Sequence, residues 1–142
     1  MSQAQSAPLR HQLRTRYAEC DLQGVVFNSH YLVYFDASLA EMWRRAFGGY
    51  RTVLDRGLDV VVAEVGLQFR APARFDELLT LEMTLTRLGQ TSITSAHRIT
   101  RDEELIVEGT MRHVLVDLET LTKTPIPDWM REGLAVWTTA PG

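Results

Sequence analysis

The chain has 142 residues, of which 45% are hydrophobic and 23% are charged, and its net charge is −3. These values are typical of one globular domain that buries its own core. They disfavour nucleic acid as a main partner, because nucleic-acid-binding proteins carry a broad basic field. The single cysteine, Cys20, excludes an internal disulfide, and no apolar run reaches membrane-spanning length. Since the N-terminus also lacks a signal-peptide pattern, we predict a cytoplasmic protein with no membrane partner.

The beginning of the chain predicts a tail followed by a strand. Residues 1–8 are mostly small and polar, and they predict a flexible tail ahead of one domain that spans residues 9–138. Residues 9–18 alternate weakly and predict a first strand. Gly24 then gives the backbone freedom that a bend requires.

A long amphipathic helix is predicted after this bend. Its N-cap is expected at Asn28 or Ser29, and the pair Gly48-Gly49 is a normal C-terminal stop. At 100° per residue the large apolar side chains gather on one face, which is expected to pack on a sheet. That face consists of Tyr31, Leu32, Phe35, Leu39, Met42, Trp43 and Ala46.

The rest of the chain predicts a loop over residues 51–57, then strands and one short helix. Apolar and polar residues alternate in segments that turn residues separate. The predicted strands cover residues 60–71, 79–86, 93–99 and 105–117, and the last helix covers residues 128–136. This order predicts an α+β domain in which one helix packs on an antiparallel sheet. Such a sheet exposes unpaired edges, so we predict that two copies form a twofold homodimer.

Three separated stretches carry a likeness to a known family. Residues 17–35 read YAECDLQGVVFNSHYLVYF, which is like an Asp-x-x-Gly-Val-Val run followed by Asn-Tyr-Leu-x-Tyr-Phe. Residues 69–78 place a proline, an aromatic residue and an acid before a strand, and residues 123–127 form a proline-containing tail. On these residues the chain resembles the hotdog-fold acyl-CoA thioesterases of the 4-hydroxybenzoyl-CoA thioesterase type. The resemblance implies a long central helix wrapped by a curved antiparallel sheet of about five strands.

The resemblance also implies the chemistry of a site. Asp21 is implied as the catalytic carboxylate, either nucleophile or general base for water, and the backbone N–H of Asn28 as the group that polarises the thioester carbonyl. Substrate contacts are expected from Tyr17, Gly24, Val25, Val26 and Tyr31. The implied substrate is an acyl-CoA thioester, with no cofactor and no metal, and the implied assembly is a homodimer or homotetramer. Many relatives have His or Tyr in place of Asn28 and Asn in place of His30, a departure that bears on acyl preference.

The residues themselves fit this chemistry. Thioester hydrolysis needs a group that attacks the carbonyl or activates water, and donors that hold the developing oxyanion. Asp21 supplies a carboxylate, and a helix N-terminus supplies free N–H groups and the positive end of the helix dipole. Asp21 lies seven residues before Asn28, with Gly24 between them. This spacing lets the chain fold back and bring both groups to one substrate atom.

Other residues offer competing interpretations. Asp36 and Glu41 are rival carboxylates on the predicted helix, and Asp36 is the better placed of the two. His30 is expected at the solvated side of the first helical turn. Cys20 is expected to be an inert thiol, because nothing beside it indicates a His-Cys pair.

Two sets of residues receive no assignment from the sequence. His97 and His113 lie on predicted strands and do not have a metal-ligand spacing. Arginines could bind the phosphates of coenzyme A. The candidates are Arg70, Arg74, Arg98, Arg101 and Arg112, and none of them is chosen.

Two further functions stay open. A non-catalytic hotdog dimer could bind acyl thioesters in the same cleft, and a hotdog hydratase or dehydratase could act on them. Asp21 favours the enzyme over the binding protein, and no Asp-x-Asn-Pro-x-x-His-like run supports the hydratase. The sequence does not determine the acyl group, or whether the carrier is coenzyme A or acyl carrier protein.

Overall fold

The structure is a computed structural model that describes residues 7–139, so residues 1–6 of the predicted tail lie outside the described residues. The described chain begins with a strand and a long helix and continues with four strands and short C-terminal helical turns. Its elements are β1 (Leu9–Arg14), η1 (Tyr17–Glu19), α1 (Asn28–Phe47), α2 (Arg51–Asp55), β2 (Leu58–Phe69), β3 (Leu78–Leu88), β4 (Ser92–Arg101), β5 (Glu104–Asp117), α3 (Asp128–Leu134) and η2 (Ala135–Trp137).

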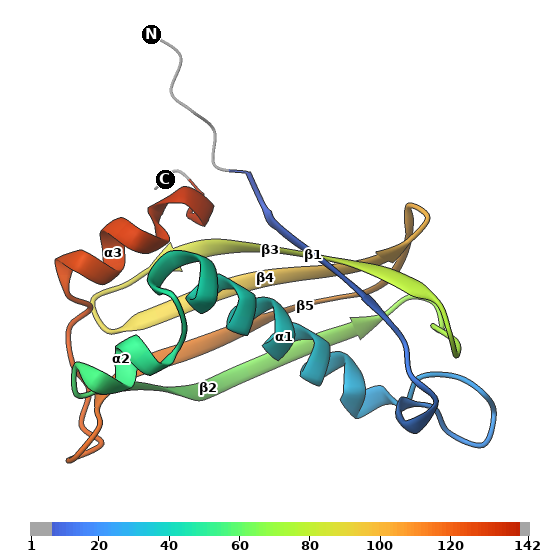
Figure 1. Ribbon diagram of the computed structural model, residues 1–142, viewed down its shortest axis with the longest axis horizontal. Helices are drawn as coiled ribbons and strands as arrows, with labels where there is room; N and C mark the ends of the chain where they lie inside the picture. The colour runs from blue at the N-terminus through green and yellow to red at the C-terminus, as the bar shows by residue number, and fades with distance from the viewer. Residues whose placement is uncertain (1–6, 140–142) are drawn as a thin grey trace, which may run out of the picture.

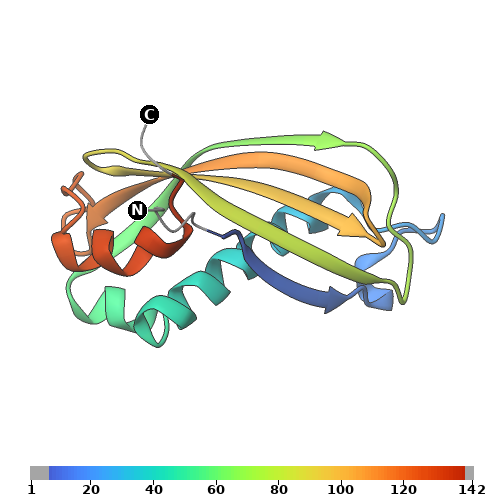
Figure 2. The same ribbon diagram turned by 90° about the horizontal axis from the view of Figure 1, so that it is seen from above.

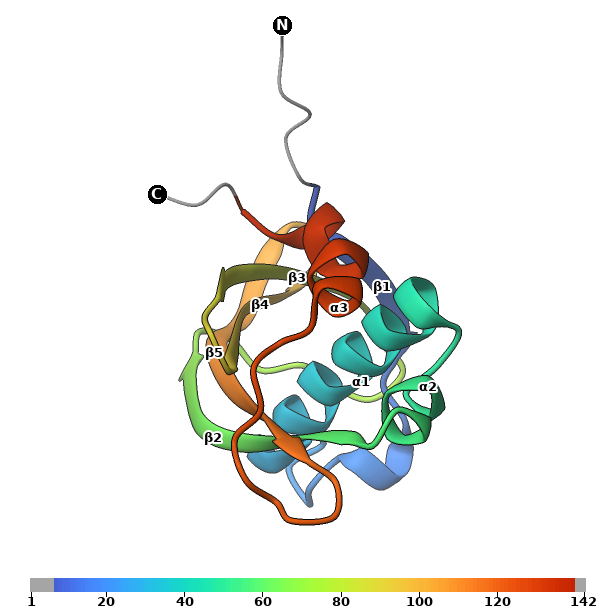
Figure 3. The ribbon, with the colours of Figure 1, turned by 90° about the vertical axis from the view of Figure 1, so that its left-hand side faces the viewer.

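All the named strands form one antiparallel sheet of five strands, in the order β1-β3-β4-β5-β2. Figure 1 shows α1 lying across one face of this sheet, and Figure 3 shows the strands curling around the helix. The predicted α+β architecture, a long central helix wrapped by a curved antiparallel sheet, is therefore confirmed. The strands predicted from alternation are present, although their ends differ by a few residues.

α1 forms because its large apolar side chains share one stripe that faces the sheet. Tyr31, Phe35, Leu39 and Met42 are each at most 7% exposed, as the predicted helical face requires. Burying a side chain of this size contributes roughly 1.5–3 kcal/mol, so packing on the sheet stabilises the helix more than its intrinsic propensity does. Gly48 adopts a left-handed φ of 84° and ends the helix at the predicted place.

The predicted N-cap of α1 is wrong. Neither Asn28 nor Ser29 is the cap; the N-cap is Phe27, which has an extended backbone (φ −68°, ψ 142°) and provides no side-chain cap. The Phe27 N–H donates to the carbonyl oxygen of Glu19 at 2.9 Å, and this bond holds the chain extended up to the helix. Asn28 is therefore the first helical residue, and its N–H has no intrahelical acceptor.

Helix and sheet approach each other closely at Gly109 of β5. A Cβ at this position would clash first with the Gly66 carbonyl oxygen of β2 and would lie 2.9 Å from the Phe35 ring, so a larger residue would displace β2 or α1. His97 of β4 stacks on the same ring, with centroids 4.4 Å apart and an interplanar angle of 13°. Its Nε2 lies 2.8 Å from the Ser95 hydroxyl, and its Nδ1 is buried with no hydrogen-bond partner among the described residues. Burial lowers the pKa of His97 to about 3.

The C-terminal turns cover the sheet at the end where α1 finishes. Trp129 of α3 packs edge-on against Phe47 of α1, with ring centroids 5.1 Å apart, and Figure 2 shows α3 at the same end of the molecule as this part of α1. The loop predicted over residues 51–57 instead contains α2, because a short helical turn places Val53 fully inside the core. No helix within residues 7–139 is both long and apolar enough to cross a membrane.

β2 is a long, exposed edge of the sheet. It has 12 residues, whereas β1 at the other edge has 6. Val61, Val62 and Phe69 of β2 are 41%, 54% and 55% exposed. An edge that combines unpaired backbone groups with exposed apolar side chains is a template for another strand. β2 is therefore the edge that we expect a second copy of the chain to cover.

We expect the protein to be at least a dimer at micromolar concentration, with the β2 strands of two copies paired about a twofold axis. Val62→Lys should weaken this dimer at least ~10-fold, because an unpaired buried charge costs several kcal/mol. Light scattering over a dilution series measures the change. Val136→Lys, at a valine of η2 that is 58% exposed, is the matched control and should leave the mass unchanged. A monomer mass for the unmodified protein would contradict the prediction.

The buried His97 should make the free energy of unfolding depend on pH. Its pKa of about 3 lies below the ordinary value of 6.5, so in acid the unfolded chain binds a proton that the folded chain refuses. The stability that neutral His97 contributes is therefore present above pH 6.5 and is lost as pH falls toward 3, by roughly 3 kcal/mol at pH 4. Chemical denaturation at pH 7 and pH 4 should show a smaller loss for His97→Gln than for the unmodified protein. Equal losses would contradict this role of His97.

Candidate active site

The loop between η1 and α1 carries Asp21. The Oδ1 atom of Asp21 accepts hydrogen bonds from the N–H groups of Gln23 at 2.8 Å and Val25 at 3.4 Å. The Gly24 N–H donates to the Asp21 carbonyl oxygen at 2.9 Å, and its left-handed φ of 77° is a conformation that favours glycine. These bonds fix the side chain through Oδ1. In the described part of the chain no donor lies within hydrogen-bond distance of Oδ2, so this oxygen is free for a ligand.

The first turn of α1 presents free backbone donors. The His30 N–H donates to the Phe27 carbonyl oxygen at 2.9 Å. The N–H groups of Asn28 and Ser29 have no acceptor among residues 7–139. Free N–H groups at a helix N-terminus, together with the helix dipole, stabilise negative charge. They can therefore hold the oxyanion that forms when a carbonyl carbon is attacked.

Asp21 and Asn28 line the same open cleft of about 420 Å³. Residues 25–28 and Tyr31 complete the wall that carries them, and residues 69–72, at and after the end of β2, form the other wall. The Tyr31 hydroxyl joins the two walls, because it accepts a hydrogen bond from the Ala73 N–H at 3.1 Å. Burial raises the pKa of Tyr31, so its phenol stays protonated. The cleft thus combines largely apolar walls with one carboxylate and one helix N-terminus.

A second carboxylate, Glu19, anchors the loop from inside the protein, where it is only 6% exposed. Its Oε1 accepts hydrogen bonds from the Arg16 N–H at 2.7 Å and the Tyr34 hydroxyl at 2.9 Å, and its Oε2 accepts one from the Arg16 guanidinium at 3.1 Å. Burial by itself raises the pKa of Glu19, but these hydrogen bonds outweigh burial and leave the pKa below its ordinary value. The Glu19 carbonyl oxygen also accepts a hydrogen bond from the Phe27 N–H, at the other end of the loop. Glu19 therefore holds the two ends of the loop together and, through Tyr34, fastens them to α1.

Comparison with known proteins identifies the family. The chain matches the family described as the thioesterase-like superfamily over residues 15–134. It belongs to this superfamily. The acyl-CoA thioester hydrolase YbgC of Escherichia coli is 28% identical over 109 residues, which cover 76% of this chain and 81% of that protein.

Solved structures of similar proteins share the whole fold. A hypothetical protein from Thermus thermophilus is 36% identical with a TM-score of 0.83, and the match covers 90% of this chain and 98% of that one. A 1,4-dihydroxy-2-naphthoyl-CoA thioesterase from Synechocystis has a TM-score of 0.83 at 18% identity, over 90% and 96% of the two chains. The predicted hotdog fold and the predicted enzyme class, a thioester hydrolase, are confirmed at the level of the family.

In this member of the thioesterase-like superfamily the rival carboxylates lie away from the cleft. Asp36 is eight residues beyond the start of α1, roughly 12 Å along the helix, and lines a separate cavity of about 220 Å³ with His113. Partial burial raises the pKa of Asp36, and the nearby His113 acts in the opposite direction. Hydrogen bonds from Arg44 and Arg45 hold the pKa of Glu41 at about 2. Neither carboxylate lines the cleft at the N-terminus of α1.

Two other candidates, His30 and Cys20, are sequence neighbours of cleft residues but do not line the cleft themselves. His30 is half-buried, and its Nδ1 is buried with no hydrogen-bond partner among the described residues, so the expected solvation of this side chain is wrong for Nδ1. Cys20 is also half-buried. Burial, followed by the charges of Glu19 and Asp21, raises the pKa of the Cys20 thiol. The thiol therefore stays protonated, which agrees with the prediction of an inert cysteine.

The structure brings most of the predicted site residues together. Those that line the cleft are Asp21, Val25, Val26, Asn28 and Tyr31. Two predicted contacts do not line it: Tyr17 is 81% exposed on η1, and Gly24 lies at the turn of the loop. The roles of all these residues in catalysis or substrate binding stay predictions.

The sequence did not reveal the second wall of the cleft or the anchor of the loop. Residues 69–72 carried the family likeness but no assigned role, because β2 meets the loop only in three dimensions. Glu19 stands two residues before Asp21, and nothing in its neighbours marks it as buried. Tyr34 could have indicated that a buried acceptor is present. It lies one turn after Tyr31 on the buried side of the helix, and a buried tyrosine needs a hydrogen-bond partner for its hydroxyl.

Tyr34→Phe tests whether Glu19 positions Asp21. The change removes one hydrogen bond to a buried carboxylate, so the free energy of unfolding should fall by about 1–3 kcal/mol. Because the loop that carries Asp21 loosens, kcat for thioester hydrolysis should fall about tenfold while KM changes little. Steady-state kinetics and thermal unfolding measure both effects. Glu82→Gln, which alters a carboxylate 3.6 Å from Arg10 on the sheet, is the control. Lower stability with unchanged kcat would mean that the hydrogen bond supports only the fold.

Proposed function

We propose that the chain hydrolyses an acyl-CoA thioester to a free acid and coenzyme A. Asp21 acts as nucleophile or as general base, and the Asn28 N–H polarises the thioester carbonyl. The observation that carries this proposal is the shared cleft, in which a carboxylate with a free oxygen and a helix N-terminus with free N–H groups lie on one wall. The name of the E. coli relative, acyl-CoA thioester hydrolase, supports coenzyme A as the carrier.

The reaction follows from where charge develops. The carbonyl oxygen of the thioester accepts a hydrogen bond from the Asn28 N–H, and attack on the carbonyl carbon places a negative charge on that oxygen. As a nucleophile, Asp21 forms a mixed anhydride and expels the coenzyme A thiolate, and water then cleaves the anhydride. As a general base, Asp21 takes a proton from water as the water oxygen attacks the carbonyl carbon; the tetrahedral intermediate then breaks its C–S bond and releases the coenzyme A thiolate, which takes up the proton. Either route uses the same free Oδ2.

This chemistry draws on the chain's own groups. Within residues 7–139 no cluster of three or more His, Cys, Asp or Glu side chains is arranged to hold a metal ion. Acyl carrier protein is the alternative carrier, and it would present the same thioester to the same cleft. The homodimer or homotetramer and the cytoplasmic location stay predictions.

Asp21→Ala should lower the rate of thioester cleavage at least ~100-fold, the lower range for a positioned acid-base group. Asp21→Asn removes the charge with little change of shape and should have a similar effect. Substrate binding should weaken much less than turnover, because the carboxylate acts in the transition state. Release of free thiol from a panel of acyl-CoA substrates measures the rate. Asp36→Asn and His30→Ala are matched controls that should keep most of the activity.

Single-turnover hydrolysis in oxygen-18 water tests the anhydride route. Label in Asp21 demonstrates an anhydride that water opens at the Asp21 carbonyl, whereas label only in the released acid is compatible with activated water and with an anhydride that water opens at the acyl carbonyl. Turnover by Asp21→Ala near that of the unmodified protein would remove Asp21 from catalysis and favour a non-catalytic acyl-thioester-binding dimer. A loss at Asp36 as large as at Asp21, in a folded protein, would move the site onto α1.

A further inference from the structure

The sequence leaves five arginines as candidates for the phosphates of coenzyme A, and the structure separates them. Two of the five arginines, Arg70 and Arg101, already form ion pairs with carboxylates. The Arg70 guanidinium lies 3.2 Å from a carboxylate oxygen of Glu108, and the Arg101 guanidinium lies 2.7 Å from one of Glu77. A phosphate would have to compete with these carboxylates for either arginine.

Two more candidates point away from the cleft. Side chains alternate between the two faces of a strand. His97, next to Arg98 on β4, is buried, and so is Met111, next to Arg112 on β5. Arg98 and Arg112 therefore lie on the outer face of the sheet, opposite to the face that packs on α1.

Arg74 is the candidate with a fixed backbone beside the cleft and an unengaged side chain. It forms a β-bridge with Val25, which lines the cleft. The Arg74 N–H donates to a carboxylate oxygen of Glu77 at 2.5 Å, and its carbonyl oxygen accepts a hydrogen bond from the Thr15 hydroxyl at 2.5 Å. Within residues 7–139 no acceptor lies within hydrogen-bond or ion-pair distance of its guanidinium.

The positive charge of Arg74 is not neutralised by the acids that follow it in the chain. Asp76 lies 3.6 Å from the Arg14 guanidinium, and Glu77 lies 2.7 Å from that of Arg101. Both carboxylates therefore have cationic partners already. An unpaired guanidinium at this position attracts an anionic group, and its planar fork suits a phosphate.

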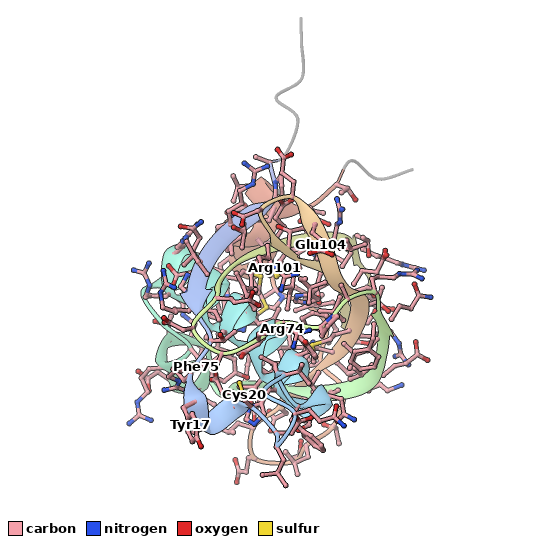
Figure 4. All side chains as sticks on the ribbon, turned by 90° about the vertical axis from the view of Figure 1, so that its right-hand side faces the viewer. Tyr17, Cys20, Arg74, Phe75, Arg101 and Glu104 are labelled. Atoms are coloured by element: carbon pink, nitrogen blue, oxygen red, sulfur yellow. The ribbon has the colours of Figure 1, made fainter. Side chains whose placement is uncertain are left out.

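An exposed aromatic pair includes Phe75, the residue that follows Arg74 in the chain. The rings of Tyr17 and Phe75 meet edge to face, with centroids 5.9 Å apart and an interplanar angle of 86°. Tyr17 is 81% exposed and Phe75 is 53% exposed, so the pair buries little of its own surface. Figure 4 shows both rings at the same end of the molecule as Arg74 and Cys20 of the Asp21 loop. Exposed aromatic rings beside a cation form a stacking platform for a nucleobase.

Buried hydrogen bonds hold this platform in place. Thr15 is 2% exposed, and its hydroxyl accepts the Glu77 N–H at 2.9 Å in addition to its bond to Arg74. Its own N–H donates to the Glu77 carbonyl oxygen at 2.9 Å. These bonds fasten the segment that carries Arg74 and Phe75 to the segment that carries Tyr17. The backbone segments that carry the rings and the Arg74 side chain therefore keep their relative positions before any ligand binds.

We propose that Arg74 and the Tyr17–Phe75 pair bind the nucleotide end of the substrate's coenzyme A. The Arg74 guanidinium pairs with a phosphate, and the exposed rings stack on the adenine base. The thioester at the other end of the same molecule then reaches Asp21 in the cleft. This inference rests on the proposed acyl-CoA thioesterase activity and specifies which part of the surface recognises the carrier.

The test compares two thioesters of the same acyl group, one of coenzyme A and one of N-acetylcysteamine, which has no nucleotide. Arg74→Ala should raise KM for the acyl-CoA about tenfold, because a hydrogen bond to a charged group is lost at a partly screened site. Its kcat, and both constants for the N-acetylcysteamine thioester, should stay unchanged. Arg74→Lys should restore part of the affinity, and the effect should shrink at high salt.

A second variant, Tyr17→Ala, tests whether the aromatic pair stacks on the adenine base. Tyr17→Ala should raise KM for the acyl-CoA about fivefold or more, since stacking on one base contributes about 1–3 kcal/mol. Tyr17→Ala should leave KM for the N-acetylcysteamine thioester unchanged. Arg87→Ala is the matched control for the lost charge: Arg87 is exposed near the opposite end of β3. It should leave KM unchanged for both substrates.

Three outcomes would overturn the inference. Unchanged KM for the acyl-CoA in Arg74→Ala would exclude the phosphate contact. An equal rise for both thioesters would mean that Arg74 shapes the cleft. A changed mass for Tyr17→Ala in light scattering, with unchanged KM, would make the aromatic pair an interface between copies of the chain.

The proposed function fails in a different way. If the unmodified protein cleaves neither thioester, the activity is refuted, and calorimetric titration with free coenzyme A still tests the nucleotide site. Tight binding that Arg74→Ala weakens about tenfold would support the site, and equal binding by both proteins would refute it.

Discussion

The burial of the apolar stripe of α1 against the concave face of the sheet determines where chemistry can occur. Phe35 meets β5 at Gly109, so one face of the middle of the helix is buried against the sheet. The C-terminal end of α1 is covered by α3 through the contact between Phe47 and Trp129. The N-terminal end is the part of the helix whose free N–H groups open into a cleft. Because a helix always leaves its first N–H groups unpaired, this geometry supplies the oxyanion-binding position of the proposed mechanism without any dedicated side chain.

The fold was predictable where the physical cause is local. Alternation of apolar and polar residues marks β3, and a glycine pair marks the end of α1 at Gly48. The N-cap of α1 was mispredicted by one residue, because the backbone hydrogen bond from the Phe27 N–H to the Glu19 carbonyl oxygen holds Phe27 extended just ahead of Asn28. α2 was missed for a related reason: the core position of Val53 selects a helical turn in a segment whose composition indicates a loop.

The candidate site was also predictable only where neighbours in the sequence determine it. Asp21 and Asn28 are seven residues apart, so one bend brings them to the same cleft, and the sequence could indicate both. The second wall, residues 69–72, comes from the end of a strand more than forty residues away, and only the curved sheet places it there. The choice among the arginines is also non-local, because it depends on which guanidinium groups already have carboxylate partners. Sequence spacing contains no information about those pairings.

Two carboxylates that stand two residues apart lie in different environments, and the proposed mechanism gives them opposite roles for that reason. Glu19 is buried, and both of its oxygens accept hydrogen bonds, so it has little capacity left to attack a carbon or to take a proton. Asp21 uses Oδ1 alone to fix its orientation and leaves Oδ2 unbonded within the described chain. In the proposed mechanism the saturated group, Glu19, supplies rigidity, and the unsaturated group, Asp21, supplies reactivity. A catalytic carboxylate on a loop needs both conditions, since a free oxygen that is not held in place gains nothing from the nearby N–H groups of α1.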